Sequence, residues 1–237
     1  MRINRFLAAA GLGSRRACEE LVREGRVYIN NVVVTDLATR VEPTDVVRVG
    51  RRIVRAQSHV YLLLNKPPGY VCTRSDERGR KTIFDLVPDH ARLFHVGRLD
   101  KESEGLLLLT NDGDLAEQLT HPSHQIDKEY EVTIDQPFDP EHTAKLLRGI
   151  TIEAGRARME SVRVITPTKL SVTLRQGLKR QIREMLWRVG YRVKKLQRVR
   201  IGPLSDSRLK KGHWRPLSHE EIAALKELGR SPRKSRR

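Results

Sequence analysis

This chain of 237 residues has little of several features on which common protein classes depend. Its two cysteines, Cys18 and Cys72, are too few for a disulfide scaffold and lack the spacing of metal ligands. No apolar run approaches the roughly 20 residues that a membrane-spanning helix needs, and the N-terminus lacks the apolar region of a secretory signal. A phosphate-binding glycine loop is also missing. We therefore expect a cytoplasmic protein with reduced thiols and no nucleotide cofactor.

Charged residues, by contrast, are abundant and unbalanced in sign. The chain has 46 Lys and Arg against 29 Asp and Glu, which gives a net charge of +17 and a pI near 10.4. Such an excess indicates a polyanionic partner, most simply nucleic acid. A membrane surface is the alternative, and the lack of a long apolar segment disfavours it. The length suits one large domain and a small one.

Residues 1–50 have the pattern of a small separate module. Apolar residues at helical spacing start at Ile3, and Ser14 is placed to cap a second helix. Two valine-rich runs around Asn30–Asn31 predict a hairpin, and residues 45–49 predict one more strand. The Gly13–Arg16 segment resembles the alpha-L RNA-binding module that is shared with a ribosomal small-subunit protein. A solvated basic face without a ligand is the alternative interpretation.

The remainder of the chain predicts one larger domain of the α+β class. Residues 51–59 are polar and aperiodic and are interpreted as a linker, residues 60–228 as the larger domain, and residues 229–237 as a disordered basic tail. Strand patterns such as Lys128–Ile134 alternate with helical ones, but without a regular strand-helix-strand repeat. This favours a mixed, mainly antiparallel sheet flanked by helices over a doubly wound sheet.

The segment Gly97-Arg98-Leu99-Asp100 is the most informative one in the chain. It sets a carboxylate between the cations Arg98 and Lys101, just before the apolar run Leu106–Leu109. A carboxylate at the edge of a core, with cations beside it, is a candidate for a catalytic group that is kept ionised. An aspartate that merely caps a turn would show the same spacing.

The longer segment from His95 to Leu106 resembles the signature of bacterial pseudouridine synthases, in the branch that modifies ribosomal RNA. The blocks Lys66–Gly69, Lys128–Val132 and Arg180–Arg183 resemble further blocks of that family, and the likeness extends from about Tyr61 to about Leu217. The resemblance implies that Asp100 is the catalytic residue, that Tyr130 lies against the target base, and that Arg183 pairs with Asp100. It also implies that uridine is isomerised without a cofactor.

The helix predicted after residue 180 has two distinct faces. Its apolar positions repeat at the spacing of a core-facing stripe, whereas Arg180, Arg183 and Trp187 form a second stripe that suits a phosphate backbone and a stacked base. A solvated charged face is the alternative. Together with the rest of the basic sequence, this predicts the RNA-binding residues Arg2, Arg5, Ser14, Arg15, Arg16, Arg26, Lys66, Arg98, Lys179, Arg180, Trp187, Lys194 and Lys195.

The expected partner is ribosomal RNA or an assembling ribosomal subunit, and a monomer is the default state. The blocks from Gln176 to Leu196 look most like the branch that acts on large-subunit RNA. Small-subunit RNA, transfer RNA, and a non-catalytic role in ribosome assembly remain alternatives. The pair His121 and His124 is a weak candidate for metal ligands, because Pro122 argues against a helix that would bring them together.

Overall fold

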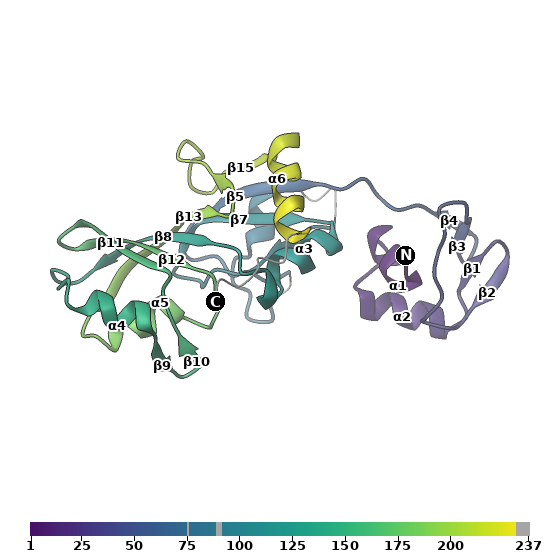
Figure 1. Ribbon diagram of the computed structural model, residues 1–237. Coiled ribbons are helices and arrows are strands. Elements are labelled where there is room, and N and C mark those ends of the chain that lie inside the picture. Colours follow the sequence, from purple (N-terminus) through teal and green to yellow (C-terminus); the bar gives the residue numbers. More distant parts are fainter. Residues whose placement is uncertain (75, 89–91, 231–237) are drawn as a thin grey trace. The chain divides into compact units, whose positions relative to one another are not determined.

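The computed structural model describes residues 1–74, 76–88 and 92–230, and it divides the chain into two compact units (Figure 1). The N-terminal unit is built mainly from residues 1–60, and the C-terminal unit mainly from the residues after 60. Most of the predicted basic tail, residues 231–237, lies outside the described residues. Residues 229 and 230, which were predicted to belong to that tail, end a helix instead.

The N-terminal unit is a pair of short helices with a four-stranded sheet. Its strands are ordered β2-β1-β3-β4. The predicted hairpin is confirmed: Asn30 and Asn31 take the left-handed φ values of 48° and 68° that a two-residue turn between β1 and β2 requires. The elements are α1 (Ile3–Ala9), α2 (Arg15–Arg23), β1 (Val27–Ile29), β2 (Val32–Val34), β3 (Val47–Val49) and β4 (Arg52–Val54).

The start of the predicted linker is wrong. Residues 52–54 form β4, which pairs with β3 in antiparallel register, and Val54 belongs to the apolar core of the N-terminal unit. This strand, Arg52-Ile53-Val54, lies between Arg51 and Arg55, so its basic surroundings resemble a linker more than the valine-rich runs of β1 and β2 do.

A single nine-stranded sheet forms the centre of the C-terminal unit. Its main path is ordered β11-β12-β8-β13-β7-β5-β15, with β6 paired to β7 and β14 to β13. The contact between β13 and β7 is parallel, and the other strand pairs of this sheet are antiparallel. The strands are β5 (Tyr61–Lys66), β6 (Phe94–Val96), β7 (Glu104–Thr110), β8 (Lys128–Ile134), β11 (Ser161–Thr166), β12 (Lys169–Leu174), β13 (Val193–Ile201), β14 (Leu204–Ser205) and β15 (Trp214–Pro216).

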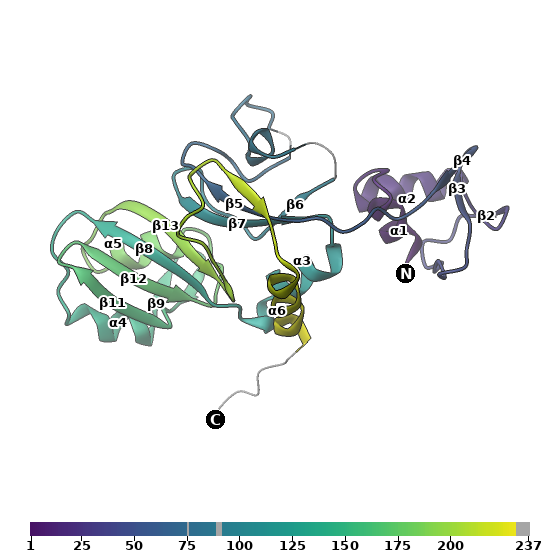
Figure 2. The ribbon, with the colours of Figure 1, turned by 90° about the horizontal axis from the view of Figure 1, so that it is seen from above.

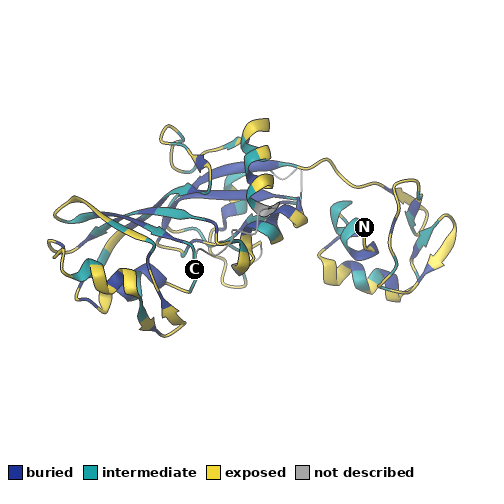
Figure 3. Cartoon of the chain, in the orientation of Figure 1, coloured by how far each residue is buried: buried dark blue, intermediate teal, exposed yellow. Residues whose placement is uncertain are grey.

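The helices of this unit cover two separate apolar cores. Helices α4 and α5 pack with β8 and β12 at one half of the sheet, and α3 and α6 pack with β5 and β7 at the other (Figures 1 and 2). Dark, buried ribbon marks both cores in Figure 3. The remaining elements are α3 (Gly113–Thr120), α4 (His142–Arg148), α5 (Gln181–Trp187), α6 (His219–Arg230), the 3-10 turns η1 (Ile83–Leu86) and η2 (Pro122–His124), and the hairpin strands β9 (Ile150–Ile152) and β10 (Gly155–Ala157).

Gly105 is the residue that lets the two halves of the sheet meet. It pairs with Arg198 where β7 and β13 run parallel, and its φ is +108°. A Cβ atom at this position would lie 2.2 Å from the carbonyl oxygen of Arg198, so no other residue fits without separating the strands. This close approach brings the loop before β7 beside the strands of the other half.

The predicted α+β class, with a mainly antiparallel sheet flanked by helices, is confirmed. Strand β8 places Tyr130, Val132 and Ile134 on a buried face, as their alternation predicted. Within the described ranges, no helix combines the length and the hydrophobicity that a membrane span requires.

Candidate active site

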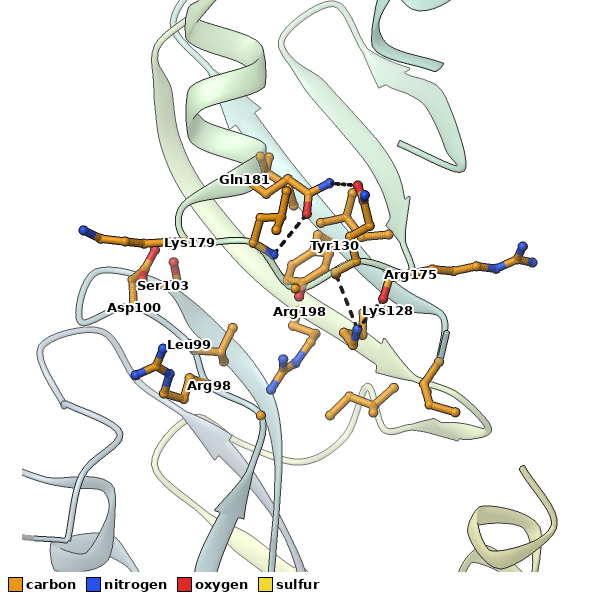
Figure 4. A pocket seen from close by; sticks show the side chains of 18 of the residues that line it. Arg98, Leu99, Asp100, Ser103, Lys128, Tyr130, Arg175, Lys179, Gln181 and Arg198 are labelled. Carbon is orange, nitrogen blue, oxygen red and sulfur yellow. Dashed lines mark hydrogen bonds between the residues drawn. The ribbon is translucent and has the colours of Figure 1, made fainter. Parts of the chain in front are cut away.

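A cavity of about 900 Å³ opens in the C-terminal unit where the two halves of the sheet meet. The loop that carries Arg98–Asp100 forms one wall, and the segment from Leu174 to Ile182 forms another. Tyr130 and Arg198 lie between these walls (Figure 4). The loops that follow β6 and β12, far apart in the sequence, therefore meet at one site.

The buried ammonium group of Lys66 holds the backbone of the loop that carries Asp100. This side chain is completely buried at the end of β5, and its Nζ donates to the carbonyl oxygens of Asp100 at 3.2 Å, Lys101 at 3.2 Å and Ser103 at 2.7 Å. A fourth contact, at 3.0 Å, goes to the carbonyl oxygen of Pro67. Burial lowers the pKa of Lys66, although nearby carboxylates oppose that shift.

These contacts correct the prediction that Lys66 binds RNA. A side chain with no exposed surface and a fully used ammonium group cannot contact a phosphate. Its role is to hold the backbone of the loop. The thiol of Cys72 adds a second anchor, because its Sγ donates to the carbonyl oxygen of Leu99 at 3.3 Å and accepts from the amide of Leu99 at 3.5 Å.

The carboxylate of Asp100 extends from this fixed loop toward the start of helix α5. Its side chain is 39% exposed, and its partner is Arg180, with Nη1 at 4.0 Å from Oδ2. The ion pair predicted between Arg183 and Asp100 is not formed: Nη1 of Arg183 donates to the carbonyl oxygen of Val193 at 3.0 Å. Burial lowers the pKa of Arg183, Arg180 lowers it further, and Asp100 raises it, so Arg183 still lies within the electrostatic reach of Asp100.

Arg180 reaches Asp100 from an unusual backbone conformation. Its φ of 52° and ψ of 26° lie in the left-handed region at the N-cap of α5, where glycine or asparagine is usual. This conformation turns the chain from the cavity wall into the helix. A non-glycine residue in this region costs of the order of 1 kcal/mol, and such residues concentrate at functional sites.

Tyr130 and Arg198 form the middle of the cavity. They lie directly opposite each other on β8 and β13, and both line the cavity. Only 3% of Arg198 is exposed; its Nε donates to the carbonyl oxygen of Leu106 at 2.7 Å, and its Nη2 is buried without a hydrogen-bond partner among the described residues. Buried Arg198 thus braces the strand opposite Tyr130, which also lines the cavity.

A half-buried lysine, Lys128, holds the opposite wall of the cavity. Nζ of Lys128 donates to the carbonyl oxygen of Arg175 at 2.9 Å and contacts that of Gln176 at 3.5 Å. Burial, and then the charge of Arg198, lower the pKa of Lys128 to about 8. Lys128 fixes the segment that leads to Arg180 as Lys66 fixes the loop of Asp100.

Two carboxylates are among the described residues that line the cavity, and they are engaged to different degrees. Glu160 lies 3.2 Å from Nε of Arg158 and 3.4 Å from Nη1 of Arg175, so both of its oxygens are paired. Asp100, by contrast, forms one ion pair among the described residues, the long contact with Arg180. Of these two lining carboxylates, Asp100 is therefore the less engaged one.

The other residues predicted to bind RNA occupy several surfaces. Arg98 and Lys179 line the cavity, and Trp187, with 63% of its surface exposed, lies in a smaller hollow of about 240 Å³ that also includes Arg180. Lys195 pairs with buried Glu104 at 3.1 Å. Ser14 caps α2 as predicted, since its Oγ accepts from the amide of Ala17. The other cations are exposed or half-buried, namely Arg2, Arg5, Arg15, Arg16, Arg26 and Lys194.

Sequence reasoning missed Arg198 and Cys72 as parts of the site. Arg198 follows the alternation of β13 and carried no separate signal, since an arginine in a basic strand looks like a surface residue. The histidines that were weak candidates for metal ligands have other contacts. Nδ1 of His121 lies 2.7 Å from Oγ of Ser123, and in the part of the chain that the structure describes no group of three metal-ligating side chains occurs.

Two family models match this chain. The model described as RNA pseudouridylate synthase matches residues 60–187, which contain Asp100, Tyr130 and Arg180. The model described as S4 domain matches residues 1–47, which form most of the N-terminal unit.

Individual proteins match over nearly the whole chain. An uncharacterized RNA pseudouridine synthase of Aquifex aeolicus is 40% identical, with 100% of this chain and 99% of that protein covered. Ribosomal large subunit pseudouridine synthase B of Bacillus subtilis is 36% identical, with 96% of each covered. Dual-specificity RNA pseudouridine synthase RluF of Escherichia coli is 37% identical over 96% of this chain and 79% of that protein. A solved pseudouridylate synthase superposes with a TM-score of 0.69 at 28% identity, covering 95% of this chain and 99% of the other.

Proposed function

Because this chain belongs to the RNA pseudouridylate synthase family, its reaction is the isomerisation of uridine in RNA, and we propose that Asp100 carries that reaction on large-subunit ribosomal RNA. The observation that supports this role is the contrast between the two cavity carboxylates. Glu160 is paired twice, whereas Asp100 sits on a braced loop and faces the cavity with one long ion pair.

The reaction explains why a carboxylate is needed there. The bond between C1′ of the ribose and N1 of uracil breaks, the base turns, and C1′ is joined to C5. The hydrogen of C5 leaves as a proton and N1 takes up a proton, so the composition of the nucleotide is unchanged. Neither oxidation nor reduction occurs. Asp100 is the nucleophile, or the anion that stabilises the detached sugar, and a fixed carboxylate serves either purpose. The rigid backbone under Asp100 keeps it in place while the base turns.

Two arginines place positive charge near Asp100. Arg180 forms the direct ion pair with Asp100. Arg183 does not contact the carboxylate, but its positive charge interacts with Asp100 at longer range. An ionised carboxylate is the form that can attack or stabilise a carbon with positive character. We therefore assign to Arg180 the pairing role that the family resemblance implied for Arg183, and to Arg183 a supporting one.

Tyr130 receives the target base. A uridine must leave its stack to reach the cavity, which costs a few kcal/mol. The ring of Tyr130 offers a stacking surface at the cavity centre, and its hydroxyl is a candidate for the transfer of the C5 proton. Contacts to phosphates by the exposed cations, and stacking on Trp187, offset the cost of unstacking.

The large-subunit target is supported by the B. subtilis relative, whose name gives that substrate. A ribosomal substrate also places the reaction in the cytoplasm. The test is to incubate the full chain with large-subunit RNA, small-subunit RNA and transfer RNA and to map pseudouridine at nucleotide resolution. We expect new sites in large-subunit RNA with the unchanged protein and with Glu102→Gln, and none with Asp100→Asn. Modification of only the other RNAs would refute the target, and modification by Asp100→Asn would refute the catalytic residue.

A further inference from the structure

The outer face of the N-terminal sheet carries a row of four side chains that the core does not use. Tyr28 on β1 lies opposite Val33 on β2 and opposite Arg48 on β3, and Arg48 lies opposite Ile53 on β4. Their neighbours along the strands, Val27, Val34, Val47 and Val54, are buried in the core. Because side chains alternate along a strand, the row lies on the face turned away from that core.

The row combines flat and apolar surfaces that are open to solvent. Val33 is 50% exposed and Ile53 is 59% exposed. Between them the guanidinium of Arg48 lies 4.1 Å from the ring centroid of Tyr28, and its Nη1 donates to the carbonyl oxygen of Gly50 at 2.6 Å. The stacked pair is therefore held in place before any ligand binds, which reduces the entropy cost of stacking a further planar group on it.

The charge around the row favours a polyanion. Residues 1–60 contain eleven arginines, six carboxylates and no lysine. Arg51 and Arg55 flank β4 and are exposed. The carboxylates near the row are already engaged: Asp45 accepts from Asn30 at 2.8 Å, and Glu24 pairs with Arg26 at 3.3 Å. Arginine both stacks on bases and binds phosphates, which lysine does less well.

We propose that this outer sheet face binds unpaired nucleotides of the RNA substrate, with one base stacked on the Tyr28–Arg48 pair. An open sheet with a half-buried aromatic ring, exposed apolar neighbours and flanking cations suits single-stranded RNA, whose bases are free to stack. A duplex keeps its base faces covered, so it can contact only the arginines. A second copy of the chain is disfavoured, because face-to-face rows would bring like charges together. The inference depends on RNA being the substrate and not on the role of Asp100.

The test compares binding of a 12-nucleotide single-stranded RNA and a 12-base-pair RNA duplex to the full chain at two salt concentrations. Tyr28→Ala is expected to weaken single-strand binding by at least about fivefold, since the ring on which the base stacks is lost. Duplex binding should change by less than about twofold, and the salt slope should stay the same because no phosphate contact is lost. Tyr28→Phe keeps the ring and should bind like the unchanged protein.

A second pair of variants does not depend on the packing of Tyr28. Ile53→Glu and Ile53→Lys both replace an exposed side chain, but we expect only Ile53→Glu to weaken single-strand binding. The proposal is overturned if Tyr28→Ala and Ile53→Glu bind the single strand as the unchanged protein does. It is also overturned if these variants change the sedimentation of the protein and leave RNA affinity intact, because the face would then be a protein interface.

Discussion

The two units of this chain use their cations in opposite ways. The N-terminal unit has arginine and no lysine, and residues such as Arg15 and Arg16 are exposed. At the cavity of the C-terminal unit, Lys66 and Arg198 are buried and donate to backbone carbonyl groups. The net charge of +17 therefore overestimates the number of cations that are available to contact RNA. Some of this charge holds the reactive loops in place, and the two uses respond differently to substitution and to salt.

Loss of a buried cation should have the largest effect on stability. Lys66→Met leaves the carbonyl oxygens of Asp100, Lys101 and Ser103 buried without their donor. We expect the free energy of unfolding to fall by roughly 2–4 kcal/mol, since each unsatisfied buried group costs about 1–3 kcal/mol. Urea denaturation measures this change. Lys101→Met removes an exposed lysine next to the same loop and should change stability by less than about 0.5 kcal/mol; equal effects of the two variants would contradict the comparison.

Substitution of Arg180 is expected to lower activity without lowering stability. Arg180→Asn removes the partner of Asp100 but suits the left-handed backbone at φ 52°. We expect kcat to fall by about 10- to 100-fold, while the free energy of unfolding stays constant or rises by up to about 1 kcal/mol. Steady-state kinetics and thermal denaturation test both parts. Arg180→Lys retains the charge and should recover part of kcat, and full activity of Arg180→Asn would show that this ion pair is dispensable.

Substitution of exposed arginines should act on RNA affinity alone. Replacing Arg15 and Arg16 together by glutamine is expected to weaken RNA binding, and to reduce the slope of log affinity against log salt by about 2 if each contacts a phosphate. We expect kcat at saturating RNA to stay the same. Binding titrations from 50 to 200 mM salt measure the slope. An unchanged slope would mean that these two arginines face something other than phosphate.

The stability of the protein should also depend on pH through Lys128. Lys128 has a pKa of about 8 in the folded protein and 10.5 as its usual value, so the unfolded chain binds more protons between these limits. The free energy of unfolding should therefore gain a component that rises with pH from about 8 to 10.5. Lys128→Met should lack it. Urea denaturation at pH 8, 9 and 10 tests the difference, and parallel pH profiles for the two proteins would show that Lys128 titrates normally.

Much of the fold could be predicted from the sequence because strand and helix periods mark buried faces. Tyr130, Val132 and Ile134 alternate in β8, and Ile182, Met185 and Leu186 face the core from α5. Strand β4 was not predicted, because its two apolar residues are surrounded by arginines at positions 51, 52 and 55. The parallel pairing of β7 with β13 could not be predicted either. It depends on the close approach that Gly105 allows because it has no side chain, and a single glycine in a strand does not identify its partner.

The candidate site was predictable as a set of sequence blocks but not as a set of contacts. Asp100 and Tyr130 line one cavity as the resemblance implied. Which arginine reaches Asp100 depends on the backbone of Arg180, and a left-handed arginine has no signature in composition or spacing. Lys66 was misjudged for a related reason: a lysine in a basic protein looks like a surface residue until its carbonyl partners are known.

The most direct test of the central claim uses RNA labelled with tritium at C5 of uridine, because the new bond at C5 releases that hydrogen. Tritium release is measured with the unchanged protein, Glu102→Gln and Asp100→Asn, and RNA binding is measured in parallel. We predict release with the first two and at least about a 10³-fold loss with Asp100→Asn, as expected when an essential catalytic group is removed, with binding within about twofold. Release by Asp100→Asn at a rate near that of the unchanged protein would contradict the assignment of Asp100.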